Sequence, residues 1–394
     1  MLKLLKKARP VALVLILILL STSILMAAGK AEDAKDKPIK LGGMYNLTGG
    51  FSSIDAPGLS GAKLKAKLIN EAGGILGGRM IEVVGYDTQT DQQAAATQSK
   101  RAIDQGVVAG LGYGDTTYVM AAAPLYQSAG IPFVTSGATH PDLPKWVGDM
   151  FFMVPFGDDD QSYAIADFAW NTLGVRKVVI WTDDSMDFTL ALSKFFKERF
   201  IELGGTIIHE LFYQTGDTDF SAHIARLRDA RDAEAVFVGS VPNEAGLTVK
   251  QIREAGIKIP IISADGYDTE LVATVPGPAL ANDVYFSTHT YRSDDRPEVL
   301  NFIEEYIKEY KREPENAFAA CGFDAVGLIA DAIERAGTTE GKALQKALAE
   351  TKNYQGVTGQ IAYTRPSRVP VKPIAIIGVQ GGKFEYLDTW WPEL

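Results

Sequence analysis

The fold is decided by a repeated stretch: GRMIEVVGYDTQTDQQAAATQSKRAIDQGVVAGLG at residues 78–112 returns in outline as GTIIHELFYQTGDTDFSAHIARLRDARDAEAVFVG at residues 205–239. Each copy starts at a glycine, runs through an apolar strand pattern and a helix pattern, and ends on a second strand at another glycine. The two glycines are 34 residues apart in both copies, and the copies are offset by 127 residues. Each copy then continues through a helix pattern to a Gly-Ile pair, Gly130-Ile131 in the first and Gly256-Ile257 in the second. This spacing predicts a duplicated α/β unit.

Strand and helix patterns alternate along the rest of the chain as well. The expected strands cover residues 39–45, 80–86, 107–111, 132–136, 177–181, 206–213, 235–239 and 260–263. The expected helices cover residues 61–72, 92–105, 190–203, 219–230 and 244–255. Short Val- and Ile-rich strands between longer helices indicate parallel sheets covered on both faces. We therefore expect an α/β fold of two similar doubly wound lobes, with a ligand site in the cleft between them, where the carboxyl ends of the strands meet.

Residues 1–29 have a composition unlike that of the rest of the chain. Four basic residues precede an apolar run at residues 11–20, and small residues follow at 27–29. This order is typical of a secretory signal peptide, and the charged stretch at residues 30–37 is expected to be a linker. An uncleaved membrane anchor is the alternative, because residues 11–28 are nearly long enough to span a bilayer. No cysteine stands near the end of this segment, so we expect a periplasmic protein without a lipid anchor or another stable membrane anchor.

The charge balance argues against a nucleic-acid partner. The chain carries 39 basic and 49 acidic residues, a formal net charge of −10, and loss of residues 1–29 would bring it to about −14. A surface of this charge repels phosphate backbones. The single cysteine, Cys321, lies in an apolar helix pattern and is expected in the core.

Enzyme signatures are missing from the sequence. The four histidines are scattered, without a pair at the spacing of metal ligands on a helix. Residues 58–61 resemble a nucleophile elbow but have the wrong spacing. The run Asp158-Asp159-Asp160 is either a divalent-cation site or a solvated loop or helix start, and we favour the second because three consecutive acids point in different directions. We expect no catalytic site, no metal and no cofactor.

Short motifs occur in order along residues 38–394. They are Ile39–Gly42, Leu47–Gly49, Gly61-Ala62, Ile69–Ile75, Tyr86–Thr88, Ala129–Pro132, Asp217–Ser221 and Ala255-Gly256. Together these motifs resemble the leucine/isoleucine/valine-binding protein family, the type I periplasmic binding proteins of branched-chain amino acid ABC importers. The resemblance implies a protein that closes its lobes over one small-molecule ligand and delivers it to the permease subunits of an importer.

The resemblance also implies how the chain is divided. Chains of this family cross three times between the lobes, which places hinges near Phe156, Ser287 and Arg365–Val371. The first lobe then comprises residues 38–156 and 288–366, and the second comprises residues 157–287 and 367–394.

In that family the α-carboxylate of the ligand is bound by a hydroxyl at a helix start and by a turn of small residues. The corresponding positions here are Thr116 and the turn Gly137-Ala138-Thr139. Thr116 stands where a strand gives way to a helix, so that free N–H groups and a hydroxyl converge on an anion. The alternative is that both threonines only cap helices.

The ammonium partner in that family is an acid after a strand of the second lobe, and Asp265, followed by Gly266, takes this position. A carboxylate opposite an anion site matches a zwitterionic amino acid. The alternative interpretation is a simple turn, because Asp-Gly is a common loop pair.

Three further positions would shape the pocket for the side chain of the ligand: Ile54, Phe188 and Val241. Met186 competes with Phe188, because one inserted residue leaves the alignment open. Val241 replaces a tyrosine of the leucine-binding members, which enlarges the cleft. Asp115 is a further departure, and it either caps the helix or binds a polar or basic part of the ligand.

These departures keep other functions open. The same fold serves a binder of an amide, a urea-like compound or an aromatic or organic acid. A soluble partner that reports ligand occupancy to a sensor protein is a second alternative, and an enzyme is a third.

Overall fold

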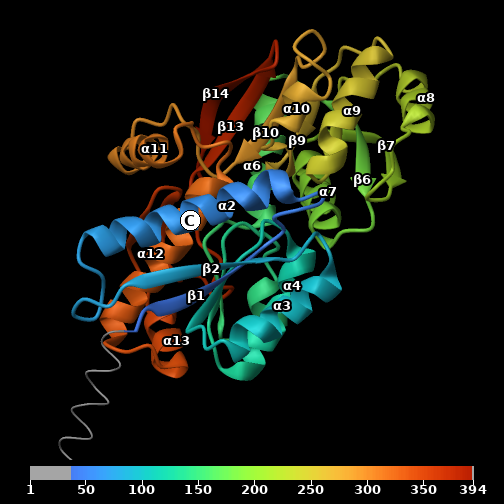
Figure 1. Cartoon of the computed structure of the whole chain (residues 1–394). Coiled ribbons are helices and arrows are strands. Elements are labelled where there is room, and N and C mark those ends of the chain that lie inside the picture. Colours follow the sequence, from blue (N-terminus) through green and yellow to red (C-terminus); the bar gives the residue numbers. More distant parts are fainter. Residues whose placement is uncertain (1–36, 393–394) are drawn as a thin grey trace, which may run out of the picture.

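The structure is a computed structural model that describes residues 37–392 (Figure 1). The predicted signal peptide and nearly all of the predicted linker lie outside the described residues. Within residues 37–392, no helix is long and apolar enough to cross a membrane. The elements form two lobes, each built on one large sheet.

Lobe 1 is built on a five-stranded parallel sheet in the order β2-β1-β3-β4-β5. Its strands are β1 (Ile39–Tyr45), β2 (Ile81–Asp87), β3 (Ala109–Gly112), β4 (Phe133–Thr135) and β5 (Phe151–Met153). One face is covered by α2 (Ser52–Glu71), α12 (Phe318–Ala336) and α13 (Gly341–Ala349), and the other by α3 (Gln92–Asp104) and α4 (Thr116–Ala129) (Figure 1). Alternate strand residues serve the two faces, since Leu41 packs with the first set of helices and Met44 with the second. Lobe 1 also holds α5 (Leu143–Val147), α11 (Pro297–Tyr310) and a hairpin of β11 (Tyr354–Gly356) and β12 (Gly359–Ile361).

Lobe 2 is built on a seven-stranded sheet in the order β14-β13-β10-β9-β8-β6-β7. Its strands are β6 (Lys177–Asp183), β7 (Thr206–Tyr213), β8 (Ala235–Gly239), β9 (Ile261–Ser263), β10 (Val284–Thr288), β13 (Ile374–Gln380) and β14 (Lys383–Trp390). Its helices are α6 (Asp158–Asn171), α7 (Asp187–Glu202), α8 (Ser221–Asp229), α9 (Pro242–Glu254), α10 (Leu271–Thr274) and the short 3₁₀ helix η1 (Asp265–Tyr267). The order β7-β6-β8-β9-β10 repeats the order β2-β1-β3-β4-β5 of lobe 1. The duplicated doubly wound unit predicted from the glycine spacing is therefore confirmed.

The expected strands are all present, with ends displaced by at most two residues. The structure adds β5 and β10, which complete the parallel part of each sheet, and β13 and β14, which run antiparallel to their neighbours. The sheet of lobe 2 is therefore mixed. Cys321 is buried on α12, as expected.

Helix α2 begins nine residues before its expected start at Gly61. The sequence favours the later start because Pro57 and the glycine after it are typical helix breakers. Pro57 has no N–H to donate to the carbonyl oxygen of Ser53. The Nδ2 of Asn316 donates to that oxygen at 2.9 Å instead. A tertiary hydrogen bond thus compensates for the proline and keeps the first turns helical.

Helices α2 and α12 cross with their backbones in contact. A Cβ on Gly61 would lie 1.8 Å from the carbonyl oxygen of Ala319, and a Cβ on Gly322 would lie 1.9 Å from a carbonyl oxygen of α2. Only glycine permits so close an approach. The crossing carries Ile54, near the start of α2, and Phe318, at the start of α12, to the boundary between the lobes.

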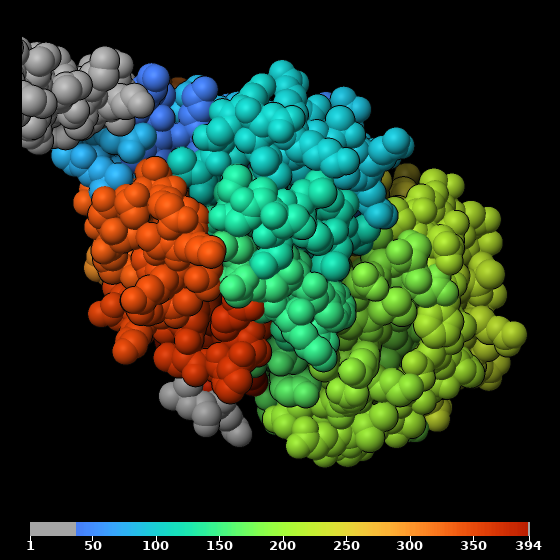
Figure 2. All heavy atoms as spheres, turned by 90° about the horizontal axis from the view of Figure 1, so that it is seen from below, coloured from blue at the N-terminus to red at the C-terminus, as the bar shows by residue number. Residues whose placement is uncertain are grey.

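The chain passes between the lobes in three segments, residues 154–157, 289–296 and 362–373. The lobes are in contact, and Figure 2 shows the cyan surface of lobe 1 meeting the yellow-green surface of lobe 2. The Oγ1 of Thr269 in lobe 2 donates to the Oγ of Ser53 in lobe 1 at 3.1 Å. The hinge positions and the lobe limits expected from the sequence stay predictions.

Candidate ligand-binding cleft

The start of α4 presents polar groups to the boundary between the lobes. Asp115 is the N-cap of α4, and its Oδ1 accepts a hydrogen bond from the N–H of Thr117 at 2.7 Å. Its Oδ2 is buried and has no partner among the described residues, and burial raises the pKa of Asp115 to about 7. Thr116 is fully buried, and its Oγ1 likewise has no partner within this part of the chain. The cap of α4 is thus Asp115 and not Thr116, which leaves the Thr116 hydroxyl free to bind something else.

The turn after β4 touches the turn before α4. A Cβ on Gly137 would lie 3.0 Å from the Cα of Gly114. The N–H of Ala138 donates to a threonine hydroxyl of β4 at 3.0 Å, which fixes the shape of the turn. Thr139 is fully buried, and its Oγ1 accepts a long hydrogen bond of 3.4 Å from the Nε2 of Gln161 in lobe 2. Thr139 is not the N-cap residue of a helix, but its carbonyl oxygen accepts from the first N–H of α6, that of Asp158, at 2.8 Å.

Asp265 lies on the opposite side of the cleft, at the start of η1 directly after β9. It is 1% exposed, and its Oδ2 lies 3.1 Å from the Nε2 of His289. Its Oδ1 has no hydrogen-bond partner in the described chain. His289 is held in turn by Phe156, whose ring stacks on the imidazole with 4.3 Å between the centroids. The carboxylate is therefore fixed through one oxygen and free at the other.

Asp158 adds a second carboxylate to this side. It is the first residue of α6, it is fully buried, and burial raises its pKa well above the ordinary value. Its Oδ1 accepts from the Nε2 of Gln161 at 2.9 Å, whereas its Oδ2 has no partner among residues 37–392. The expectation of a helix start is confirmed, but the expectation of a solvated one is wrong for Asp158 and for Asp160. Asp160 is mostly buried and pairs with Arg365 at 3.0 Å, because the start of α6 faces lobe 1 and the segment 362–373 and not water.

Gln161 joins the polar groups of the two lobes. Its Nε2 contacts Thr139 and Asp158, and its Oε1 accepts from the N–H of Asp265 at 3.2 Å and from the Oγ of Ser287 at 3.4 Å. These bonds bring the predicted carboxylate site of lobe 1 and the predicted ammonium site of lobe 2 into one cluster.

Apolar side chains close the cluster on its remaining sides. Ile54, Phe188 and Val241 are each at most 5% exposed and belong to one continuous apolar cluster. The ring of Phe188 lies 3.4 Å from the position of a Cβ on Gly266, whereas Met186 lies against the hydroxyl of a threonine at the start of α4. Both candidates thus face the cleft from different places. That these residues contact a ligand stays a prediction.

Phe318 is an apolar wall that the sequence reasoning missed. Its ring lies 2.7 Å from the position of a Cβ on Gly137 and meets the ring of His289 edge-on at 5.6 Å. It therefore bridges the turn of lobe 1 and the imidazole beside Asp265. The start of α12 supplies it, and nothing in the sequence motifs points there.

The free atoms of the cluster define what it can bind. Thr116 offers a hydroxyl near the N-terminal amides of α4, which suits an anion. Asp115 in lobe 1 and Asp158 and Asp265 in lobe 2 each have one buried carboxyl oxygen without a partner among the described residues. Buried carboxyl groups that lack a partner are costly, so a ligand with a cationic or N–H donor group fits the lobe 2 side. Among the described residues, no group of three or more His, Cys, Asp or Glu side chains could hold a metal ion.

Comparison with known proteins shows which family this chain resembles. A family model described as periplasmic binding protein matches residues 38–383. The chain is 28% identical over 323 residues to a Leu/Ile/Val-binding protein homolog of Brucella melitensis, covering 80% of this chain and 84% of the relative. A branched-chain amino acid transporter substrate binding protein of Streptococcus pneumoniae, solved in complex with isoleucine, superposes with a TM-score of 0.84 at 30% identity, covering 90% of this chain and all of the other.

A third similar structure binds a different class of molecule. It is a solute binding protein of an ABC transporter from Rhodopseudomonas palustris in complex with 3,4-dihydroxybenzoic acid, with a TM-score of 0.79 at 25% identity, and it covers 90% of this chain and 97% of the other. The family match and the alignments over most of the chain confirm the resemblance inferred from the sequence motifs. The chain belongs to the periplasmic binding protein family.

Proposed function

We propose that this protein captures an amino acid, branched-chain or related, in the cleft between lobes 1 and 2 and delivers it to the permease subunits of an ABC importer. The observation that carries the proposal is the pairing of unpartnered buried groups across the cleft: the hydroxyl of Thr116 in lobe 1 opposite the free oxygens of Asp158 and Asp265 in lobe 2. A zwitterion satisfies both sides at once.

The two ends of the ligand have separate roles in this proposal. Thr116, Thr139 and the first amides of α4 bind the α-carboxylate, because hydroxyl and amide donors converge there with the positive end of the helix. Asp265 and Asp158 bind the ammonium group, which supplies a hydrogen-bond donor to the carboxyl oxygen that each leaves without a partner among the described residues. Phe188 and Val241 line the side-chain end.

The periplasm is the proposed compartment, on the strength of the signal-peptide pattern of residues 1–29 and the family match. N-terminal sequencing of protein released by osmotic shock tests this, and an intact Met1 in the membrane fraction would contradict it.

An aromatic or organic acid is the second candidate ligand. The apolar residues Phe188 and Val241 and the likeness to the dihydroxybenzoate-binding protein favour it. An amide, a urea-like ligand or a soluble sensor partner would use the same cleft. The buried carboxylate of Asp265 counts against a ligand that has an anionic group and no cation, because like charges repel strongly at low dielectric.

Charge matching at Asp265 tests the proposal. A thermal-shift screen of amino acids and small organic acids first finds the best ligand, since binding stabilises the folded form by mass action. Asp265→Asn keeps the size and removes the charge, so we expect a loss of about 2–5 kcal/mol, roughly 30- to several thousand-fold in affinity, by calorimetric titration. Thr139→Val should cost less, about 1–3 kcal/mol, because the backbone amides remain.

Asp229→Asn, an exposed position at the end of α8 in the same lobe, is the matched control and should bind like the wild type. If Asp265→Asn binds as tightly as the wild type, the amino-acid proposal fails and the organic-acid or amide candidate takes its place.

A further inference from the structure

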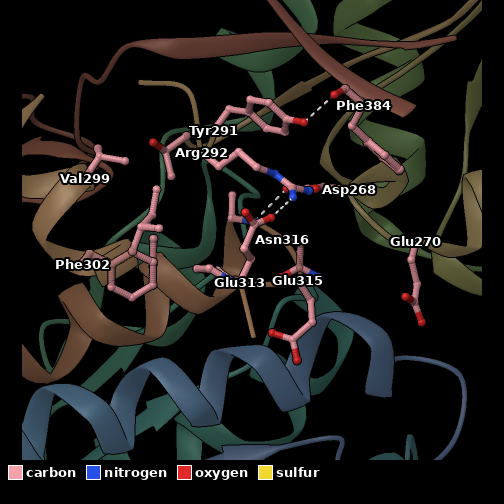
Figure 3. A pocket seen from close by; sticks show the side chains of 15 residues that line it. Asp268, Glu270, Tyr291, Arg292, Val299, Phe302, Glu313, Glu315, Asn316 and Phe384 are labelled. Atoms are coloured by element: carbon pink, nitrogen blue, oxygen red, sulfur yellow. Dashed lines mark hydrogen bonds and ion pairs between the residues drawn. The ribbon is translucent and has the colours of Figure 1, made fainter. Parts of the chain in front are cut away.

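A second cavity lies between the lobes and shares no lining residue with the cleft described above (Figure 3). Its volume is about 240 Å³. It is lined by Asp268, Glu270, Thr290, Tyr291, Arg292, Val299, Phe302, Ile303, Glu313, Pro314, Glu315, Asn316, Ala317, Ala320 and Phe384. The segment after η1 and strand β14 belong to lobe 2, whereas α11 and the start of α12 belong to lobe 1. The connecting segment 289–296 forms the remaining wall.

The walls and the size of the cavity suit a small molecule with an apolar body. Val299, Phe302 and Ile303 of α11 face Phe384 of β14 across the space. An apolar cavity of about 150 Å³ is large enough to hold benzene, so 240 Å³ holds a single ring with a short substituent.

The charges of the lining leave an excess of carboxylates. Arg292 is the one basic residue of the lining, and it pairs with Glu313, as the dashed lines in Figure 3 show. Glu315 pairs with Arg312 at 2.6 Å and accepts a hydrogen bond from a tyrosine of α11. Asp268 and Glu270 remain without a cationic partner among the described residues.

Asp268 is nearly buried in the lining and is held in place by hydrogen bonds. It is 7% exposed, and its Oδ2 is fixed by the Oγ1 of Thr288 at 2.6 Å and by the N–H of Ala317 at 3.0 Å. Its Oδ1 accepts no hydrogen bond within residues 37–392. The hydroxyl of Thr290, another lining residue that is 8% exposed, also lacks a partner in this part of the chain. A rigid and nearly buried carboxylate with one free oxygen is a preorganised acceptor for a cationic donor.

We propose that this cavity is a second binding site, for a small organic cation whose ammonium group pairs with Asp268 and Glu270 and whose apolar body lies between Phe302 and Phe384. The inference does not depend on the identity of the ligand in the cleft. The carboxylates select the charge, and the ring-sized apolar space selects a monoamine over a polyamine or a metal ion.

Benzylamine is the probe, and benzyl alcohol is its neutral control. We expect calorimetric titration of the whole protein to show saturable binding of benzylamine and at least tenfold weaker binding of benzyl alcohol. Asp268→Asn should weaken the binding of benzylamine at least tenfold, and Glu270→Gln should weaken it about threefold. Glu82→Gln changes an exposed acid on β2, outside the cavity, and should leave the affinity for benzylamine unchanged.

Location is measured separately, by crystals soaked in 4-bromobenzylamine, whose bromine is expected between Phe302 and Phe384. Equal binding of benzyl alcohol, unchanged binding by Asp268→Asn, or a bromine in the other cleft overturns the proposal. If the Asp268→Asn variant does not fold, Glu270→Lys, at an exposed position, is tested in its place. We expect a tenfold loss of affinity for benzylamine, and an unchanged affinity would contradict the site. Failure here leaves the proposed function untouched, because that function rests on Thr116, Asp158 and Asp265, none of which lines this cavity.

Discussion

At the scale of single residues, the cleft depends on how one amide distributes its hydrogen bonds. Gln161 donates to Thr139 and Asp158 and accepts from Asp265 and Ser287, so each of its polar atoms is used twice. Asp158 and Asp265 each keep one carboxyl oxygen without a partner among the described residues. Hydrogen bonds thus hold the polar groups in place while some of their oxygens lack a partner, which is the arrangement that a specific ligand site requires.

Asp158→Asn should separate stability from binding. Because burial raises the pKa of Asp158 well above its ordinary value, the folded protein holds this proton more tightly than the unfolded chain does. The contribution of this group to stability is therefore present below the unfolded pKa and lost as the pH rises through the folded pKa. We expect Asp158→Asn to raise the free energy of unfolding of the ligand-free protein by about 1–3 kcal/mol at pH 8, and by less at pH 5.

The same variant should bind the cleft ligand at least tenfold more weakly, because an amide, unlike the carboxyl group, cannot ionise to pair with the ammonium group. Calorimetric unfolding at the two pH values and titration with the ligand measure both effects. A variant that is less stable at pH 8 and binds normally would give Asp158 a purely structural role.

The sequence predicts one half of this site better than the other. Thr116, Thr139 and Asp265 follow strands that the hydrophobic pattern predicts, so inspection of strand ends finds them. Asp158 and His289 follow β5 and β10, which the pattern does not predict, so neither was placed in the expected ligand site. β5 has only three residues, too few for a period to be visible.

At the scale of elements, the contact of α2 with α12 sets the lobe 1 wall of the cleft. The two helices meet backbone to backbone at Gly61 and Gly322, so a change there moves both helix starts, where Ile54 and Phe318 stand. Neither side of this contact can be relieved by a rotamer change, because the obstructing atoms are main-chain carbonyl groups.

Gly61→Ala should therefore destabilise the protein strongly. The new Cβ would meet the carbonyl oxygen of Ala319, and we expect a loss of about 3 kcal/mol in the free energy of unfolding. The matched control is Gly85→Ala on β2, whose Cβ would meet the Cδ2 of Leu59 at 2.8 Å, the movable end of a side chain. The control should lose about 1 kcal/mol or less, since the leucine can rotate away. Urea denaturation of both variants measures the difference, and equal losses would mean that the helices separate easily.

Other elements were missed or misplaced because they depend on partners distant in the chain. The early turns of α2 are helical because Asn316 replaces the hydrogen bond that Pro57 cannot make. β13 and β14 lie outside the repeated unit and take their place through pairing with β10. Local sequence patterns carry no information about such contacts. The repeated unit can be recognised because the same glycine spacing occurs in both copies.

At the scale of the whole molecule, the cleft is shut. Thr116, Thr139 and Asp265 are at most 1% exposed, so a ligand reaches them only when the lobes separate. The three connecting segments are the places where such a motion has to occur. Under the proposed function, binding would select the closed arrangement by the free energy of the contacts made across the boundary.

Small-angle scattering should detect this closure. We expect a smaller radius of gyration with saturating ligand than without, approaching about 21 Å, the value of a compact chain of this length. Asp265→Asn under the same conditions should show a smaller change at equal ligand concentration. An unchanged radius, with binding verified by titration, would mean a rigid site that fills by another route.

The order of the strands in lobe 2 also constrains when this protein can fold. β13 pairs with β10 although 85 residues separate their ends, and α12 covers α2 from almost the other end of the chain. A nascent chain that stops before residue 318 leaves the apolar face of α2 uncovered and the edge of β10 unpaired. Neither lobe can therefore finish folding on the ribosome ahead of the last segments.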